Sequence, residues 1–443
     1  MTEQFDAPDL AIERATVITM DGTGTVKRNA TITIRDGMIQ AIAGPRDSDS
    51  RPTARRTIDV RGGIVMPGLV NAHTHLAMTV LRGLADDCDL DGFLARMLPA
   101  EGALLSPSTV ALGTELAVAE CFRSGITSAL DMYFFLEAAH EVAERTGFRL
   151  HSGPVFIEFP GPDQRDFAER MAWADDFLSA RSDTIGSTNW LSPHSTYLLS
   201  QDQLTQIREL AEKHGARVHI HACETRAEIE QVQARHGRSP IAVLHEVGLL
   251  CPGTVLAHGV HLTDADISLI ASSGASVTHN PASNLKLASG IARVSDLLAA
   301  GVNVALGTDG TASGNDLDLW LAGRLAAYVA KGVGDDATTV PAATMLEMMT
   351  INGAKALGRE HDLGSIEVGK RADLVILDPD SPSLTPSFDP VSSAAYASSR
   401  GDVRWVVIDG KVVVDDRRLT TIDIDRVLGD VRSLMPTIET LVP

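Results

Sequence analysis

Alternating apolar and polar positions mark both ends of the chain. Near the N-terminus the alternation flanks Asp36-Gly37, a pair suited to a type I′ hairpin turn. Near the C-terminus it returns in residues 405–416, with Asp409-Gly410 at a second turn. Two sheet-forming ends around one long middle predict a small β-sandwich domain formed from both termini.

The middle of the chain repeats a different unit: a short β-branched run, a polar loop that carries His or Asp, and a helical stretch. Repeated strand-helix units predict an α/β fold, here a (β/α)8 TIM barrel with its chemistry at the C-terminal strand ends. The eight runs cover residues 64–75, 126–133, 149–156, 187–195, 217–225, 254–261, 275–283 and 302–310.

A length of 443 residues accommodates such a barrel together with a small second domain. The expected parts are the N-terminal half of the β-sandwich at 1–62, the barrel at 63–358, and the C-terminal half of the β-sandwich with a terminal helix at 359–443.

Net charge and hydropathy exclude several function classes. The formal charge of −20 repels phosphate backbones and anionic lipids, so we expect neither a nucleic-acid nor a membrane partner. No apolar run approaches the roughly 20 residues that a membrane helix needs. The acidic N-terminus lacks the basic start and apolar stretch of a signal peptide, which makes the cytoplasm the expected compartment. A small-molecule substrate is then the expected partner, and the sequence is compatible with a homo-oligomer.

The 4 cysteines are widely spaced and form no CxxC pair. This spacing argues against a disulfide framework and against a thiolate zinc site. We interpret the cysteines as buried, reduced thiols.

Histidines close the first run as His73-Thr74-His75. Alternate residues of a strand point the same way, so both imidazoles face the barrel mouth and can bind one ion. Alone, such a pair is also compatible with two solvated or core histidines.

The fifth run carries His219 and His221, followed by Glu224. His221 lies nearer the C-terminal end and is the better ligand, whereas His219 is expected deeper, behind the ligands. Glu224 can reach the space above the metal. By itself it could equally be a first-turn carboxylate of the next helix.

The eighth run ends at Asp309, whose carboxylate can ligate an ion and accept a proton from the attacking water. The alternative for Asp309-Gly310 is an ordinary turn. His258 and His194 end the sixth and fourth runs, and either alone is more often a hydrogen-bonded structural histidine.

Joint placement favours the metal site, because five of the eight strand ends present a His or Asp at the same face. His73, His75, His221 and Asp309 leave a coordination position open for water, as a hydrolytic ion requires. One divalent metal ion per chain is expected, with Zn(II) fitting best and Fe(II) accepting the same ligands. A binuclear site would need a further bridging ligand, such as a carboxylated lysine on the fourth strand, where His194 stands instead.

The predicted chemistry is hydrolysis at an electrophilic ring carbon. A divalent cation lowers the pKa of bound water, and Asp309 takes the proton. Glu224 then passes protons to the ring nitrogen and the leaving amine, while His258 holds the attacking oxygen. His194 is free to contact the substrate.

These residues lie in motifs that resemble the amidohydrolase superfamily. The motifs are VMPGLVNAHTHLAMTVLRGLADD (65–87), IHACET (220–225), VTHNPASNLKL (277–287), GTDGTAS (307–313) and DLGSIEVGKRADLVILD (362–378). Within the superfamily they are similar to the branch of S-adenosylhomocysteine/methylthioadenosine deaminases and triazine chlorohydrolases. The resemblance runs over nearly the whole chain.

The resemblance implies the same roles for the four metal ligands, and it makes Glu224 and His258 the catalytic pair. Glu101, in MLPAEG, matches a carboxylate that hydrogen-bonds ribose hydroxyls in adenosine-type deaminases, and His194 matches a substrate-contacting histidine. Pro154 stands where those deaminases carry an arginine toward the ribose or amino-acid tail. This departure leaves the recognition of such a tail open.

The first functional hypothesis is therefore a metal-dependent deaminase of a 6-aminopurine nucleoside such as adenosine, methylthioadenosine or S-adenosylhomocysteine. The second keeps the metal site but takes another aminated or chlorinated heterocycle, such as a free purine base, a pterin or an s-triazine. The third is a catalytically silent barrel, against which the complete ligand set and Glu224 argue.

Overall fold

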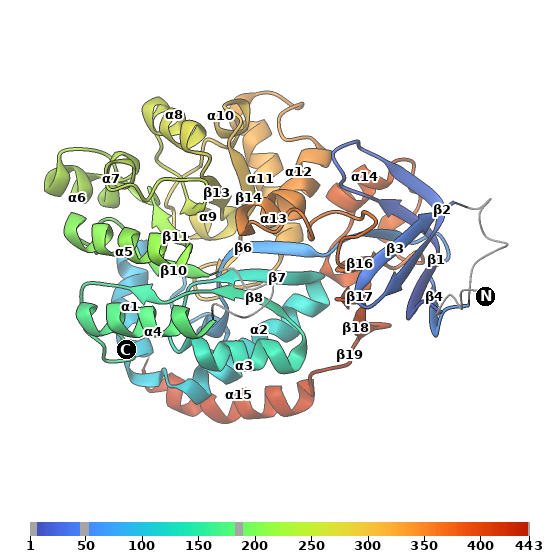
Figure 1. The fold of residues 1–443 in the computed structure, drawn as a ribbon, viewed down its shortest axis with the longest axis horizontal. Coiled ribbons are helices and arrows are strands. Elements are labelled where there is room, and N and C mark those ends of the chain that lie inside the picture. The colour runs from blue at the N-terminus through green and yellow to red at the C-terminus, as the bar shows by residue number, and fades with distance from the viewer. Residues whose placement is uncertain (1–6, 45–52, 182–188, 442–443) are drawn as a thin grey trace.

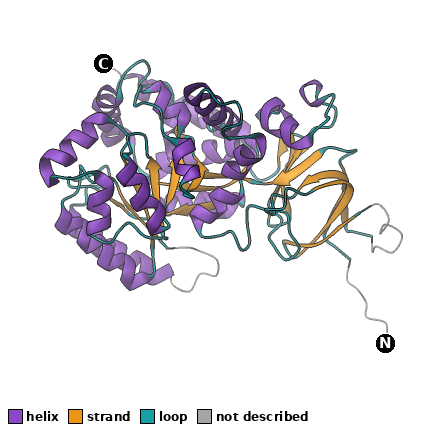
Figure 2. Ribbon diagram, turned by 90° about the horizontal axis from the view of Figure 1, so that it is seen from above, coloured by secondary structure: helices purple, strands orange, loops and turns teal. Residues whose placement is uncertain are grey.

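The computed structural model describes residues 7–44, 53–181 and 189–441. A body of parallel strands surrounded by helices lies beside a sheet formed by the two ends of the chain (Figure 1). Figure 2 shows the same separation, with the helices gathered around the strands of the larger body. The start of the run at 187–195 lies outside the described residues.

The terminal sheet joins the two ends of the chain. Its strand order is β19-β18-β17-β16-β5-β1-β2-β3, with β4 paired to β1. The central junction is antiparallel pairing between β16 and β5. The strands are β1 (Leu10–Ile18), β2 (Val26–Arg35), β3 (Met38–Ala43), β4 (Arg56–Asp59), β5 (Ile64–Pro67), β16 (Leu374–Leu377), β17 (Val403–Ile408), β18 (Lys411–Asp415) and β19 (Arg418–Leu419).

Apolar side chains from both ends of the chain form the core of this sheet. Ile12 and Ile32 from the N-terminal strands are buried in one cluster with Ile376 and Val407 from the C-terminal strands. The sheet made from both termini is thus present. Its packing as two layers of a sandwich stays a prediction.

Both predicted hairpin turns are confirmed. Asp36 and Gly37 have φ of 51° and 76°, and Asp409 and Gly410 have φ of 49° and 72°, as a type I′ turn requires. The two turns also meet: the Gly37 carbonyl accepts from Ala372 N at 2.8 Å, and Gly410 N donates to the Ala372 carbonyl at 3.1 Å.

The first predicted run, 64–75, divides into two strands that serve different sheets. β5 belongs to the terminal sheet, whereas β6 (Leu69–His75) pairs with β7 in the larger body. Every residue of β5 is buried, as is nearly all of β6, so the sequence shows one continuous apolar run. The terminal sheet therefore includes residues 64–67, which the sequence assigned to the barrel.

The larger body is of the TIM-barrel type, with parallel pairing throughout. Its strands form the orders β14-β13-β12-β11-β10-β9 and β15-β6-β7-β8. Each of the eight predicted runs contains at least one of them. The strands after β6 are β7 (Ile126–Asp131), β8 (Arg149–Ser152), β9 (Val155–Phe156), β10 (Trp190–Pro193), β11 (Arg217–Ala222), β12 (Thr254–His258), β13 (Ser276–His279), β14 (Asn303–Leu306) and β15 (Asp309–Gly310).

Two interrupted segments join these two sets of strands. β8 pairs with β7 and β9 pairs with β10, although only Gly153 and Pro154 separate β8 from β9. In the same way, β14 pairs with β13 and β15 pairs with β6. These two segments lie where one set of strands passes into the other, and parallel pairing points the carboxyl ends of the strands within each set the same way.

Helices cover the outside of the strands. They are η2 (Leu76–Leu81, a 3₁₀ helix), α1 (Leu90–Leu104), α2 (Pro107–Ser124), α3 (Leu136–Thr146), α4 (Phe167–Arg181), α5 (Gln201–His214), α6 (Arg226–His236), α7 (Pro240–Glu246), α8 (Asp264–Ser273), α9 (Pro281–Lys286), α10 (Val294–Ala299), α11 (Leu319–Gly334), α12 (Ala342–Met349), α13 (Ile351–Leu357), α14 (Pro390–Ser392) and α15 (Ile424–Glu439).

The predicted terminal helix is α15, which lies against α2 of the larger body (Figure 1). Arg426 of α15 donates to Glu115 of α2 at 2.6 Å. Within the described ranges, no single helix is long and apolar enough to cross a membrane. Taken together, α1 and α2 meet that criterion of length and composition, but the pair is bent by 118° at its junction.

Candidate active site

The polar residues of interest converge at the C-terminal strand ends. His73 and His75 end β6, His221 lies near the end of β11, and Asp309 begins β15 directly beside β6. His73 is fully buried, and the Asp309 side chain is only 8% exposed. Parallel pairing of neighbouring strands brings these residues together although they are far apart in the sequence.

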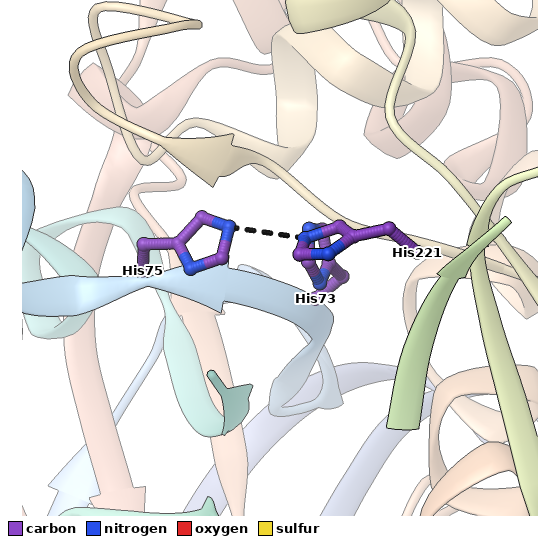
Figure 3. Close-up of side chains that lie close together, drawn as sticks. All are labelled: His73, His75 and His221. Atoms are coloured by element: carbon purple, nitrogen blue, oxygen red, sulfur yellow. Dashed lines mark hydrogen bonds between the residues drawn. The ribbon is translucent and has the colours of Figure 1, made fainter. Parts of the chain in front are cut away.

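The side-chain atoms meet at one point. His73 Nε2 and His75 Nε2 each lie 3.2 Å from Asp309 Oδ1. His75 Nε2 lies 3.4 Å from His221 Nε2 (Figure 3). Two overlapping groups of candidate ligand atoms share His73. One is His73, His75 and His221, the other is His73, His258 and Asp309, and the atoms of each group lie within 4.8 Å of one another.

The opposite nitrogens of the rings fix their protonation. His75 Nδ1 donates to the Met132 carbonyl at 2.6 Å, and His221 Nδ1 donates to the His194 carbonyl at 2.9 Å. Since a carbonyl can only accept, Nδ1 of each ring carries a hydrogen, and Nε2 is the atom that remains to bind an ion or to share a proton with the facing ring.

His73 is the most deeply buried of the four residues. Its Nε2 faces Asp309 Oδ1 at 3.2 Å, and its Nδ1 lies 2.8 Å from His219 Nε2. A buried imidazole nitrogen directed at a carboxylate oxygen suits a metal ligand. His219 lies behind His73, at the depth that the sequence predicted.

The electrostatics of the cluster also favour a positive charge. Burial lowers the pKa of His75, but the hydrogen bond and charge of Asp309 outweigh burial and raise this pKa to about 9. Burial raises the pKa of Asp309, yet hydrogen bonds from His73 and His75 reverse the shift and hold the pKa well below its usual value. The site is thus built around an ionised carboxylate that attracts a proton or a metal ion.

Two serines orient the carboxylate. Ser283 Oγ and Ser313 Oγ donate to Asp309 Oδ2 at 2.6 and 2.8 Å, which leaves Oδ1 directed toward the imidazoles. The sequence analysis missed both serines. They stand in the motifs VTHNPASNLKL and GTDGTAS, but nothing in the motifs tells which oxygen they contact.

Glu224 and His258 lie next to the ligands. Glu224 Oε2 is 3.7 Å from His258 Nε2. Burial raises the pKa of Glu224, an effect that His258 opposes. The Glu228 carboxylate accepts from Cys223 N at 2.8 Å and from Glu224 N at 2.7 Å, so the loop carrying Glu224 is held in place.

Asn284 holds His258 from the other side. Its Oδ1 accepts from His258 Nδ1 at 2.8 Å, which directs His258 Nε2 toward Glu224 and the ligands. Asn284 is a second residue that the sequence analysis missed, because the contact joins two different loops.

A cavity of about 280 Å³ opens above the ligands. At its metal end His75, His221, Glu224, His258 and Asp309 line the wall. The cavity can therefore bring a small molecule to the metal position and to the catalytic candidates together.

Glu101 and His194 line the same cavity. Tyr133 Oη donates to Glu101 Oε1 at 2.6 Å. Burial raises the pKa of Glu101, while the hydrogen bond from Tyr133 lowers it. The other carboxylate oxygen of Glu101 forms no hydrogen bond that the described structure records, which suits it to a ligand hydroxyl.

Pro154 lies buried between β8 and β9, and its carbonyl accepts from Ser192 N at 2.8 Å. It is not among the lining residues; Val155 and Ile157 line the cavity at this position. An apolar surface thus stands next to Pro154, the position at which the resemblance led us to expect an arginine.

The TIM-barrel type fold and the convergent His/Asp cluster at its mouth define a class, the metal-dependent hydrolases that place an ion at the strand ends. Residues 64–413 match the Amidohydrolase family, and the chain belongs to this family. The resemblance seen in the motifs is thereby confirmed.

Similar proteins extend over almost the full length. The chain is 42% identical to a 5-methylthioadenosine/S-adenosylhomocysteine deaminase of Syntrophobacter fumaroxidans, covering 97% of this chain and 98% of that protein. It is 39% identical to a 5′-deoxyadenosine deaminase of Methanosarcina acetivorans, covering 96% and 97%. An adenosine deaminase from Xanthomonas campestris with bound zinc superposes with a TM-score of 0.95 at 38% identity, covering 98% and 99%.

Proposed function

We propose that the protein is a hydrolytic deaminase of 6-aminopurine nucleosides, which converts the substrate and water into the 6-oxo product and ammonia. The observation that carries the proposal is a single cavity joining a metal-ligand cluster to Glu101. The names of the similar proteins support this substrate class.

His73, His75, His221 and Asp309 are the proposed ligands of one divalent ion. Zn(II) is the proposed metal, because the donors are three imidazoles and a carboxylate and because the similar Xanthomonas campestris structure holds zinc. Fe(II) accepts the same donors. When bound, the ion activates water for attack at neutral pH.

The chain's own residues then move the protons. Asp309, ionised and held by two serines, accepts the proton of the attacking water. Glu224, whose pKa is raised by burial, carries a proton to the purine ring nitrogen and to the leaving amine. His258 Nε2 faces the same space and positions the attacking oxygen.

Glu101 is proposed to bind the ribose, because a carboxylate oxygen accepts hydrogen bonds from sugar hydroxyls while Tyr133 holds the other oxygen. His194 is proposed to contact the substrate between the metal end and Glu101.

The test is direct. Purified, zinc-loaded protein is incubated with adenosine, 5′-deoxyadenosine, methylthioadenosine and S-adenosylhomocysteine, and ultraviolet absorbance and ammonia are followed. We expect turnover of at least one nucleoside and loss of turnover with a chelator. Absence of turnover for all four contradicts the proposal.

A further inference from the structure

Many of the residues that line the cavity with Glu101 are apolar. Leu94, Leu98, Phe134, Ile157 and Phe159, called here the apolar wall, all line it. Leu94 and Leu98 share one face of α1 with Glu101, since residues three and four apart in a helix are neighbours. The apolar wall thus begins beside the residue proposed to hold the ribose and continues toward the cavity rim, where Leu98 is 47% exposed.

No lysine or arginine is found among the described residues that line this cavity. Three basic side chains that lie close to lining residues in the sequence are engaged with other groups. Arg170 donates to both oxygens of Asp163, at 2.9 and 2.5 Å, and Arg165 donates to Asp163 at 3.3 Å. Lys286, on α9, donates to Asp86 at 2.7 Å.

Arg235, on α6, is engaged as well. It donates to the Tyr197 carbonyl at 3.1 Å and lies 3.9 Å from Glu158. A carboxylate along the apolar wall therefore meets apolar carbon and the Glu101 carboxyl, and none of the described lining residues is a lysine or arginine that could pair with it.

We propose that the apolar wall is a subsite for the 5′ substituent, and that it selects nucleosides with an uncharged, apolar 5′ group over those with a zwitterionic amino-acid tail. The inference rests on the proposed function, because Glu101 fixes the ribose. An apolar 5′ group gains burial against the wall. A zwitterionic tail loses hydration there and receives no ion pair in return.

The experiment compares matched tails on the zinc-loaded enzyme. The substrates are methylthioadenosine, S-adenosylhomocysteine and the 5′-n-butylthio analogue, which has nearly the length of the homocysteine tail without its charges. We expect kcat/KM to be at least about tenfold higher for the two apolar substrates, a ratio equal to about 1.4 kcal/mol. An S-adenosylhomocysteine value equal to or above that of the n-butylthio analogue overturns the inference while leaving the deaminase proposal intact.

Failure of the proposed function has a different signature. If the enzyme deaminates neither adenosine, which has no added tail, nor any of the three thioethers, both the deaminase function and the subsite are contradicted. Whenever the enzyme deaminates at least one adenine nucleoside, the comparison of the three thioethers tests the proposed subsite.

A variant locates the subsite. Leu98→Arg places a cation at the exposed rim of the apolar wall, and Leu98→Gln is the matched polar control without charge. The measured quantity is kcat/KM for S-adenosylhomocysteine divided by kcat/KM for the n-butylthio analogue. We expect this ratio to be at least about threefold higher in Leu98→Arg than in Leu98→Gln, and we expect added salt to reduce the difference. Equal ratios in the two variants contradict placement of the tail along this wall.

Discussion

Three residues next to the reaction centre hold left-handed backbone conformations. Cys223, His258 and Asp309 have φ of 57°, 77° and 60°. Such conformations in residues other than glycine cost about 1–3 kcal/mol each and persist only where the surroundings enforce them. Here hydrogen bonds hold the three residues in place. Cys223 is bonded to the Glu228 carboxylate, His258 to Asn284, and Asp309 to two serines.

Glu224 is predicted to be the proton carrier. Its pKa is raised by burial, so the proton is retained at higher pH than on an ordinary carboxyl group, and kcat falls once the pH exceeds this raised pKa. Glu224→Gln is expected to lower kcat at least about 100-fold and to remove that alkaline fall, with metal content unchanged. Steady-state pH profiles and metal analysis measure both effects. Exposed Glu230 gives the control: Glu230→Gln retains the wild-type profile.

Asn284 is predicted to set the direction of His258. Asn284→Ala removes the acceptor of His258 Nδ1 and leaves a buried donor unpaired, which costs about 1–3 kcal/mol. We expect kcat to drop about tenfold or more while bound zinc stays at the wild-type level. A variant with normal kcat shows that His258 needs no such partner.

The convergence of His73, His75, His221 and Asp309 could be predicted, because a strand's alternation and the direction of parallel strands fix which side chains point to the same end. Their role as metal ligands stays a prediction. Ser283, Ser313 and Asn284 could not be assigned in this way, since their roles depend on loop contacts that no periodicity encodes.

At the scale of elements, α2 supports the segment that follows His75 through close backbone contact. Gly113 of α2 lies against η2, the helix that follows His75, and a Cβ at this glycine would stand 2.4 Å from the Ala77 carbonyl oxygen. Its own carbonyl accepts from Thr79 Oγ1 at 2.6 Å. The position of His75 thus depends on the absence of a side chain at Gly113 in α2.

Gly113→Ala is expected to destabilise the fold by about 1–3 kcal/mol, because the added methyl group overpacks this contact. This expected change in stability is opposite in sign to the effect of helix propensity, which favours Ala over Gly by about 1 kcal/mol. Gly332→Ala on α11, where nothing lies within 4 Å of the added Cβ, is the control that should stabilise. Thermal or urea unfolding compares the two, and zinc content should fall only for the Gly113 variant.

The eight runs were predictable as strands, but the division between β5 and β6 was not. Pro67 and Gly68 interrupt an otherwise apolar stretch, and both flanking segments are buried. The pattern of apolar residues indicates which positions are buried, but it does not indicate which sheet a strand joins. Pairing of β5 with β16, far away in the sequence, decides the division.

At the scale of the whole molecule, a buried ionic cluster connects the barrel-type body to the terminal sheet. Arg149, at the start of β8, donates to both oxygens of Asp373 at 3.0 Å and lies 2.9 Å from Asp409. The Asp373 side chain is 5% exposed, so it has little access to water.

Arg149→Met is expected to cost about 3–5 kcal/mol, because it leaves a buried carboxylate without its partner. Arg238, exposed and paired with Glu246 at 2.7 Å, provides the comparison: Arg238→Met should change stability by less than about 1 kcal/mol. Denaturant unfolding measures both. Similar values for the two variants show that the cluster does not hold the two parts together.

Metal removal is expected to affect stability as well as activity. An ion that binds only the folded chain stabilises it by about 2.7 kcal/mol at 100 times its Kd. Dialysis against a chelator should therefore lower the Tm and abolish deamination, and added zinc should restore both. An unchanged Tm contradicts metal binding by His73, His75, His221 and Asp309.

The pairing of β5 with β16 has a consequence for synthesis on the ribosome. The nascent chain releases β5 early, yet its antiparallel neighbour begins only at Leu374, after the entire barrel segment has been translated. Until then β5 exposes an unpaired edge of apolar sequence, which is the kind of segment that aggregates or recruits chaperones. Folding of this sheet is therefore tied to the last part of translation, and a chain stalled before Leu374 keeps that edge open.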